Sequence, residues 1–304
     1  MSDATLDRRT ALAGIRATRK RKPLPIARIG IYLFLIVMLI YFLVPIYIMV
    51  TTSLKDMDQI RAGNVLELPR NPSFRAWVHA WSTACTGLDC NGISVGFWNS
   101  VKITVPAVFL AVLIGGITGY TLSFWRFRGA NLLFGIMVLA IFIPYQVFIF
   151  PMVRMTAALG LFGTLHGIVL IHVIFGLPIT TLMFRNYYAS LPPELIKAAR
   201  VDGAGYFTIF RRIVLPLSTP MIIVAVIWTA TGVWNDFLMG QVFAGRPAQP
   251  MTVQLNNIIN TQEGAREYNM EMAATLLTAL VPLVIYFVSG KWFVRGIAGG
   301  ALKG

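Results

Sequence analysis

Charged residues are scarce in this chain. Only 12% of its 304 residues are Asp, Glu, Lys or Arg, whereas 57% are hydrophobic. A soluble domain ordinarily carries about 25% charged residues, so a pair of buried soluble helical domains explains this composition poorly. Apolar runs of about 18 residues or more recur, and runs of that length are long enough to span a bilayer. The composition therefore predicts a polytopic membrane protein.

The chain also lacks the patterns that most enzymes use. It has no G-x-x-x-x-G-K-[ST] phosphate loop, since the segment SGKW at 289–292 has neither the earlier glycine nor the hydroxyl residue. The three histidines, His79, His166 and His172, form no metal-ligand set, and no nucleophile stands beside a base. We therefore expect no catalytic residue, no metal and no cofactor in this chain, and any ATP-derived energy must come from partner subunits.

Six apolar segments are candidate membrane spans. Because backbone groups in lipid must be satisfied within the segment, apolar spans of this length are helices, and the predicted fold is all-α. The expected spans are 26–50, 93–125, 130–152, 164–184, 219–243 and 272–292. We divide the chain into a basic tail (1–25), a six-helix membrane domain (26–292) and a C-terminal tail (293–304).

Basic residues lie on one side of this arrangement. They occur in the first tail and just after it (Arg28), after the second span, in the loop 186–218 and just before it (Arg185), and from Lys291 to the C-terminus. Eighteen of them against four acidic residues account for the whole net charge of +14. Cytoplasmic loops carry an excess of Lys and Arg, so both termini are expected in the cytoplasm. The basic first tail is interpreted as a topology determinant beside anionic lipid rather than as a nucleic-acid site. The apolar run behind it is too long for a cleavable signal peptide.

The longest expected external loop, 51–92, contains both cysteines. Cys85 and Cys90 stand in the segment CTGLDC. Two cysteines so close together in an oxidising compartment favour a small disulfide loop, and a pair of free thiols is the alternative. Without nearby histidines they make a poor zinc site.

The loop 186–218 is charged and helix-forming, although nothing about crossing a membrane requires such a segment. Two prolines before Glu194 suit the first turn of a helix, and that acid complements the helix dipole. Gly203 ends the first short helix in a conformation that other residues avoid. A second helix is expected over 204–214, stopped by Leu215 and Pro216. Such a segment either docks into a soluble partner or packs under its own bundle.

This segment resembles the EAA loop of ABC importer permeases, the element that docks into the nucleotide-binding subunit. The matching residues are Ala198, Ala199, Asp202, Gly203, Ala204, Phe207, Leu215 and Pro216. The acidic residue that names the motif is Lys197 here, so a salt bridge from that position is lost, and Glu194 one turn earlier is a partial substitute. WNDF at 234–237 and the ending FVRGIAGGALKG are similar to maltose-type carbohydrate permeases, and the CTGLDCNG segment makes the chain look most like glucose/mannose-type permeases.

The resemblance implies a MetI-like fold in a bacterial inner membrane. It also implies a second permease subunit, a dimer of ATPase subunits that binds ATP and Mg, and an extracellular solute-binding protein. The C-terminal tail would insert between the two ATPase subunits, although its glycines make residues 295–304 too flexible to form a stable helix alone. Lipid anchoring is the alternative for this tail.

Candidate residues for a sugar pathway combine hydrogen-bonding side chains with aromatic faces. Counting about 1.5 Å per residue from the ends of their spans, His172 and Trp228 come near mid-bilayer. Gln146, Asn235 and Asp236 come nearer the external end. The alternatives are a structural hydrogen bond for His172, core packing for Trp228, and capping of an external gate for the last two. The spans are nearly free of ionisable groups, which weighs against a secondary transporter coupled to ions.

Overall fold

The computed structural model describes residues 26–87, 89–125, 127–260 and 266–301, and its regular structure there is helical, without strands. The chain divides into two compact units, Met1–Ile48 and Met49–Gly304. The division falls inside α2 (Ile26–Ser53), a 28-residue apolar helix that covers the first expected span.

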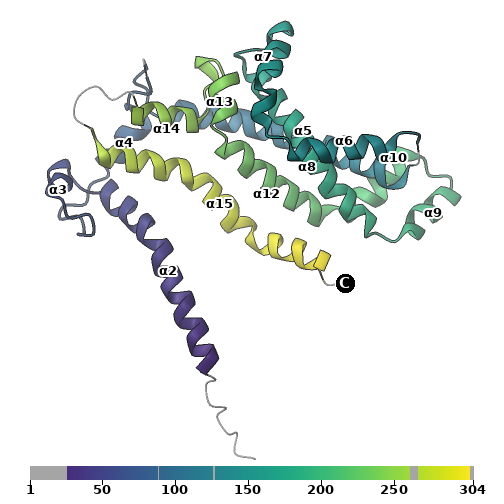
Figure 1. Ribbon diagram of the computed structural model, residues 1–304, viewed down its shortest axis with the longest axis horizontal. Coiled ribbons are helices and arrows are strands. Elements are labelled where there is room, and N and C mark those ends of the chain that lie inside the picture. Colours follow the sequence, from purple (N-terminus) through teal and green to yellow (C-terminus); the bar gives the residue numbers. More distant parts are fainter. Residues whose placement is uncertain (1–25, 88, 126, 261–265, 302–304) are drawn as a thin grey trace, which may run out of the picture. The chain divides into compact units, whose positions relative to one another are not determined.

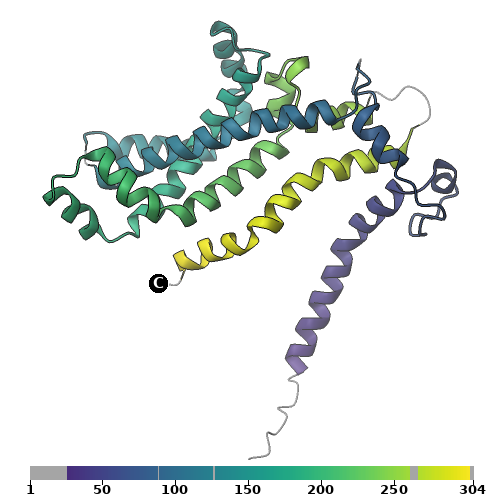
Figure 2. The same cartoon turned by 180° about the vertical axis from the view of Figure 1, so that it is seen from behind.

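Three long helices form the centre of the second unit: α5 (Ser94–Phe124), α8 (Leu165–Ala189) and α12 (Thr219–Asn235). They lie side by side, and α15 (Tyr268–Ala301) runs along α12 (Figures 1 and 2). Glycines on α5 allow the close approach of α8. A Cβ atom on Gly119 would lie 2.8 Å from the Cβ atom of Phe184 and 3.0 Å from the amide nitrogen of Arg185.

Shorter helices connect and flank this group. In chain order they are α3 (Met57–Arg61), α4 (Arg75–Ser82), α6 (Ala130–Phe142), η1 (Tyr145–Phe148), α7 (Ile149–Ala158), α9 (Pro193–Val201), α10 (Tyr206–Ile209), η2 (Phe210–Val214), α11 (Leu215–Leu217), α13 (Leu238–Phe243), η3 (Arg246–Ala248) and α14 (Met251–Asn260). Four helices of the described residues are long and apolar enough to cross a membrane, and six spans result if each of two bent helix pairs counts as one.

The third expected span is not one helix. α6 ends at Phe142, and the chain resumes in η1 and α7 after a bend of 103°. Ile143 has an extended backbone (ψ 124°), the conformation that the ring of the following Pro144 favours at the residue before it. The expectation of a continuous helix over 130–152 is therefore wrong.

The fifth span is also interrupted, at both ends. α12 stops at Asn235, Asp236 is extended, and α13 is a separate short helix. Before it, Leu215 and Pro216 do not stop the preceding helix as expected. A π-helical turn, η2, continues into α11, and the 77° bend comes between Leu217 and Thr219. The wide turn accommodates Pro216, which has no N–H to close an ordinary helical turn.

The last helix continues beyond the sixth expected span, as far as Ala301. A segment that lengthens an existing helix needs no new nucleus, which is the costly step of helix formation. The glycines of this segment therefore join the helix, although they would not form one alone; residues 302–304 lie outside the described residues.

Candidate functional site

The segment α9–α11 packs one face against the helical group and leaves the other open. Ile196 and Ala199 of α9 are buried, at the helical spacing that a single face requires. Between them and beyond them the helix is exposed, and Val201 is 87% exposed. The segment therefore packs under its own bundle, which was one of the two alternatives, and its other face is exposed.

Gly203 makes the turn after α9. Its φ is +80°, in the left-handed region, and a Cβ atom built there would meet nothing within 4 Å. Conformation, not space, therefore requires glycine at this position. The Ala204 amide donates to the Ala199 carbonyl oxygen at 2.9 Å, which closes the helix end.

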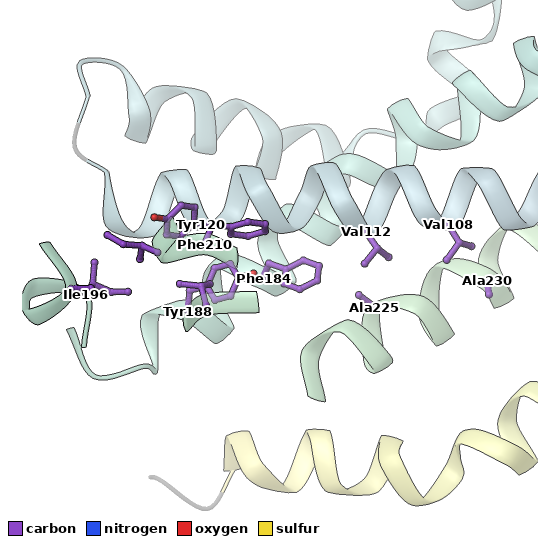
Figure 3. Packing of buried hydrophobic residues seen from close by; sticks show 12 residues of the cluster. Val108, Val112, Tyr120, Phe184, Tyr188, Ile196, Phe210, Ala225 and Ala230 are labelled. Carbon is purple, nitrogen blue, oxygen red and sulfur yellow. The ribbon is translucent and has the colours of Figure 1, made fainter. Parts of the chain in front are cut away.

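The second half of the segment is anchored through Ile209, Phe210 and Val214, all buried. They join an aromatic cluster with Tyr120 and Tyr188, to which α5 and α8 contribute (Figure 3). Phe207 points the other way and is 75% exposed.

Most of the residues expected to dock are exposed in the structure. They are Glu194, Lys197, Ala198, Asp202, Gly203, Phe207, Leu215 and Pro216. Ala199 is buried and Ala204 is half-buried, so these two small residues let the segment lie close to the bundle instead of facing outward. Sequence reasoning missed Leu195 and Val201, whose exposed apolar side chains add to the surface.

Two of the expected pathway residues meet inside the second unit. The Nε2 atom of His172 lies 4.0 Å from the Oδ2 atom of Asp236, and both side chains are largely buried. Asp236 was expected nearer the external end than His172; the chain leaves the helix at Asp236, and the carboxylate of this residue reaches His172. The same Oδ2 atom accepts a hydrogen bond from the Gly240 amide at 3.1 Å, so the carboxylate also caps α13.

A cavity of about 470 Å³ contains Trp228 among its lining residues. Its lining is mainly apolar and includes Tyr145, Phe148 and Phe175, and Tyr145 lies close enough to Asp236 to interact with it electrostatically. Gln146 and Asn235 are exposed and do not line it. The aromatic residues were missed by sequence reasoning, although Phe175 stands one helical turn after His172.

Cys85 and Cys90 are joined by a disulfide bond in the structure. The loop they close is tied to α14, because the Nδ2 atom of Asn257 donates to the Thr86 carbonyl oxygen at 3.2 Å. Among the described residues, no group of three or more His, Cys, Asp or Glu side chains is placed to hold a metal ion.

The sequence matches, over residues 107–299, the family described as "Binding-protein-dependent transport system inner membrane component". An osmoprotective compounds uptake permease protein of Synechocystis sp. is 36% identical over 71% of this chain and 72% of its own. A probable ABC transporter permease of Pyrococcus horikoshii is 34% identical over 91% and 98% of the two chains. A glucose import system permease protein of Saccharolobus solfataricus is 30% identical over 90% and 95%.

Similarity also extends to a solved structure. A chain of a bacterial ABC transporter involved in the import of the acidic polysaccharide alginate superimposes with a TM-score of 0.74, covering 88% of this chain and 96% of that one. The two are 21% identical, so this likeness concerns the fold alone.

Proposed function

The chain belongs to the family of binding-protein-dependent transport system inner membrane components, and we propose that it is the permease subunit of an ATP-driven carbohydrate importer. It forms half of a translocation pathway in the inner membrane, together with a second permease subunit. An extracellular solute-binding protein delivers the solute. The chain itself is a transport component rather than an enzyme.

The α9–α11 segment is the docking element for the ATPase subunits. The observation that carries this assignment is the combination of a buried anchoring face with exposed Leu195, Val201 and Phe207. Exposure of apolar side chains to water is unfavourable, and a partner that covers them removes this cost. Because the segment is anchored to the bundle, movement of the partner is passed on to the bundle. ATP and Mg bind to these partner subunits, since this chain has no phosphate loop.

The basic side of the chain faces the cytoplasm, with both termini there. The docking segment carries Arg200, Arg211 and Arg212 and so lies on the same side. This places the loop with Cys85 and Cys90 on the external side, where the binding protein is. The orientation agrees with the docking role, because ATP is in the cytoplasm.

The transported solute is a sugar, and we favour a monosaccharide such as glucose or mannose. The aromatic lining of the cavity supports a sugar, whose C–H patches stack on rings. His172 and Asp236 are not part of this lining, and we assign them to the same pathway because Tyr145 of the lining interacts with Asp236. One similar protein is named for glucose. Another is named for osmoprotective compounds, which keeps another sugar or a polyol as the second candidate.

Uptake assays in proteoliposomes test the assignment. The importer is reconstituted with its ATPase subunits and binding protein, and accumulation of labelled glucose, mannose and a polyol is measured with and without ATP inside. We expect glucose or mannose uptake only with ATP and the binding protein. Equal uptake without ATP would instead support a secondary transporter, with the His172 and Asp236 pair as its ionisable centre.

A further inference from the structure

The carboxyl end of α5 is capped by a side chain of the docking segment. The Nη2 atom of Arg200, on α9, donates to the carbonyl oxygen of Phe124, the last residue of α5, at 2.7 Å. The same guanidinium lies over the Trp125 ring, with its Cζ atom 4.5 Å from the centroid. Carbonyl groups of the last helical turn have no partner within the helix, and that end carries partial negative charge. A cation from another element therefore binds well there.

A second attachment follows the turn at Gly203. The Tyr120 hydroxyl donates to the carbonyl oxygen of Tyr206 at 3.1 Å, and the Tyr206 hydroxyl lies 2.6 Å from the Thr121 hydroxyl oxygen. The Tyr206 ring also contacts Tyr120 and Trp125, at centroid distances of 4.8 and 5.1 Å. Both halves of the docking segment are thus fixed to the last turns of α5.

The amino end of α5 holds the connection that leads into α14. The Asn99 side-chain amide donates to the carbonyl oxygens of Pro247 and Gln249 at 2.9 and 3.0 Å. The Ser100 hydroxyl oxygen accepts from the Met251 amide at 2.8 Å. α14 in turn contacts the disulfide loop through Asn257. The start of α14 therefore rests on α5 and cannot shift without breaking these bonds.

We propose that α5 transmits conformational change between the ATPase face and the solute face. Arg200 is the positioning residue that fixes the docking segment to this helix. The helix has 31 residues and is about 46 Å long, so it reaches from one face of a bilayer to the other. Arg200 touches neither nucleotide nor solute and acts through the backbone of α5. This inference rests on the proposed function, because an importer is the kind of protein whose ATP hydrolysis must respond to its solute-side partner.

The test uses the complete importer in lipid, with three variants: Arg200→Gln, Arg200→Lys, and Arg128→Gln as the matched control. Arg128 is exposed and lies outside the docking segment, in the loop after α5. We measure ATPase association, basal ATP hydrolysis, and the stimulation of hydrolysis by the loaded binding protein. Arg200→Gln should keep association and basal hydrolysis but lose about tenfold in stimulation, in the usual range of coupling between sites. Arg200→Lys keeps the charge but not the planar stacking, and should be intermediate.

Unchanged stimulation in Arg200→Gln, or the same loss in Arg128→Gln, overturns the role of Arg200. Loss of ATPase association together with stimulation also overturns it, because Arg200 would then be part of the docking surface itself. If Arg200→Gln does not fold, as judged by its thermal unfolding, Trp125→Leu removes the stacking contact and is measured in its place. The wild-type chain is measured first. If it does not associate with an ATPase, that result contradicts the proposed function rather than the role of Arg200.

A second experiment tests whether α5 connects the docking segment with the start of α14. Ser100→Ala removes one bond at the far end of the helix and is measured alone and combined with Arg200→Gln. If both act through α5, the double variant loses no more stimulation than the more severe single variant. Losses that multiply, as they do for distant and independent sites, overturn the proposal.

Discussion

At the scale of single residues, Gly203 is required for its backbone conformation. We predict that Gly203→Leu leaves membrane insertion intact and sharply lowers ATPase association, because a side chain costs about 1–2 kcal/mol in the left-handed region and the φ of +80° cannot relax without moving both halves of the segment. Co-purification of the ATPase subunits with the variant measures the effect.

Gly203→Asn is the matched control. Asn enters the left-handed region more readily than other non-glycine residues, and the space around this position is open. This variant should associate nearly as well as the wild type. Normal association and uptake by Gly203→Leu would rule out the docking assignment.

The cysteine pair gives a second prediction at this scale. Cys85 and Cys90 should be unreactive toward a maleimide in the denatured, unreduced protein and should both react after reduction, since the structure pairs them. Mass spectrometry counts the labels. Two labels without reductant would show free thiols and contradict the external disulfide.

Residue positions were predicted from the sequence where local chemistry decides them. A left-handed glycine was expected because the chain must turn between two short helices, and the structure has it at Gly203. The approach of Asp236 to His172 did not follow, because it depends on where α12 ends. The inward orientation of Ala199 is likewise a consequence of packing against α5 and α8, which a single sequence does not specify.

At the scale of helices, the contact between α5 and α8 depends on residues without side chains. We predict that Gly119→Ala destabilises the folded protein, at a cost of about 1–3 kcal/mol for overpacking, because the new methyl group would overlap Phe184 and the backbone of Arg185. Gly135→Ala on α6 is the control, since nothing lies within 4 Å of its Cβ position.

Thermal unfolding in detergent measures both variants. Gly119→Ala should lower the midpoint by several degrees, whereas Gly135→Ala should leave it unchanged or raise it, because alanine is the better helix former. Equal midpoints for the two variants would contradict the close α5–α8 packing.

The sequence predicted which segments are helical far better than it predicted where the helices are interrupted. Hydrophobicity alone identifies segments that must be helical in lipid, and the helices over the first, second, fourth and sixth expected spans agree with it. Breaks are harder, because proline does not decide them by itself. Proline is tolerated inside four of the long helices, at Pro45, Pro106, Pro178 and Pro282.

At the scale of the whole molecule, the C-terminal helix is expected to act on the ATPase side. We predict that removal of residues 298–304 lowers transport-coupled ATP hydrolysis while the bundle stays folded, because this segment prolongs α15 and is expected on the basic, cytoplasmic side. The loss of association free energy with the ATPase subunits should be on the order of a few kcal/mol at most. The entropy cost of ordering a glycine-rich end offsets much of what its contacts contribute.

Coupled ATPase activity, uptake and ATPase association are compared between the truncated and full-length chains. A truncation without effect on all three would leave lipid anchoring as the role of this end. A truncated chain that no longer folds would show that the segment supports the sixth span, contrary to the expectation.

The break at Pro144 also has a consequence for biosynthesis. α6 has 13 residues, about 20 Å of helix, against a hydrocarbon core of about 30 Å. As it leaves the ribosome, this segment is too short to be held across the bilayer by lipid alone, and α8, against which it packs, is made later. We therefore expect its stable insertion to wait for α8. Reporter fusions placed directly after Phe142 should report a mixture of orientations, and fusions placed after Ala189 a single one.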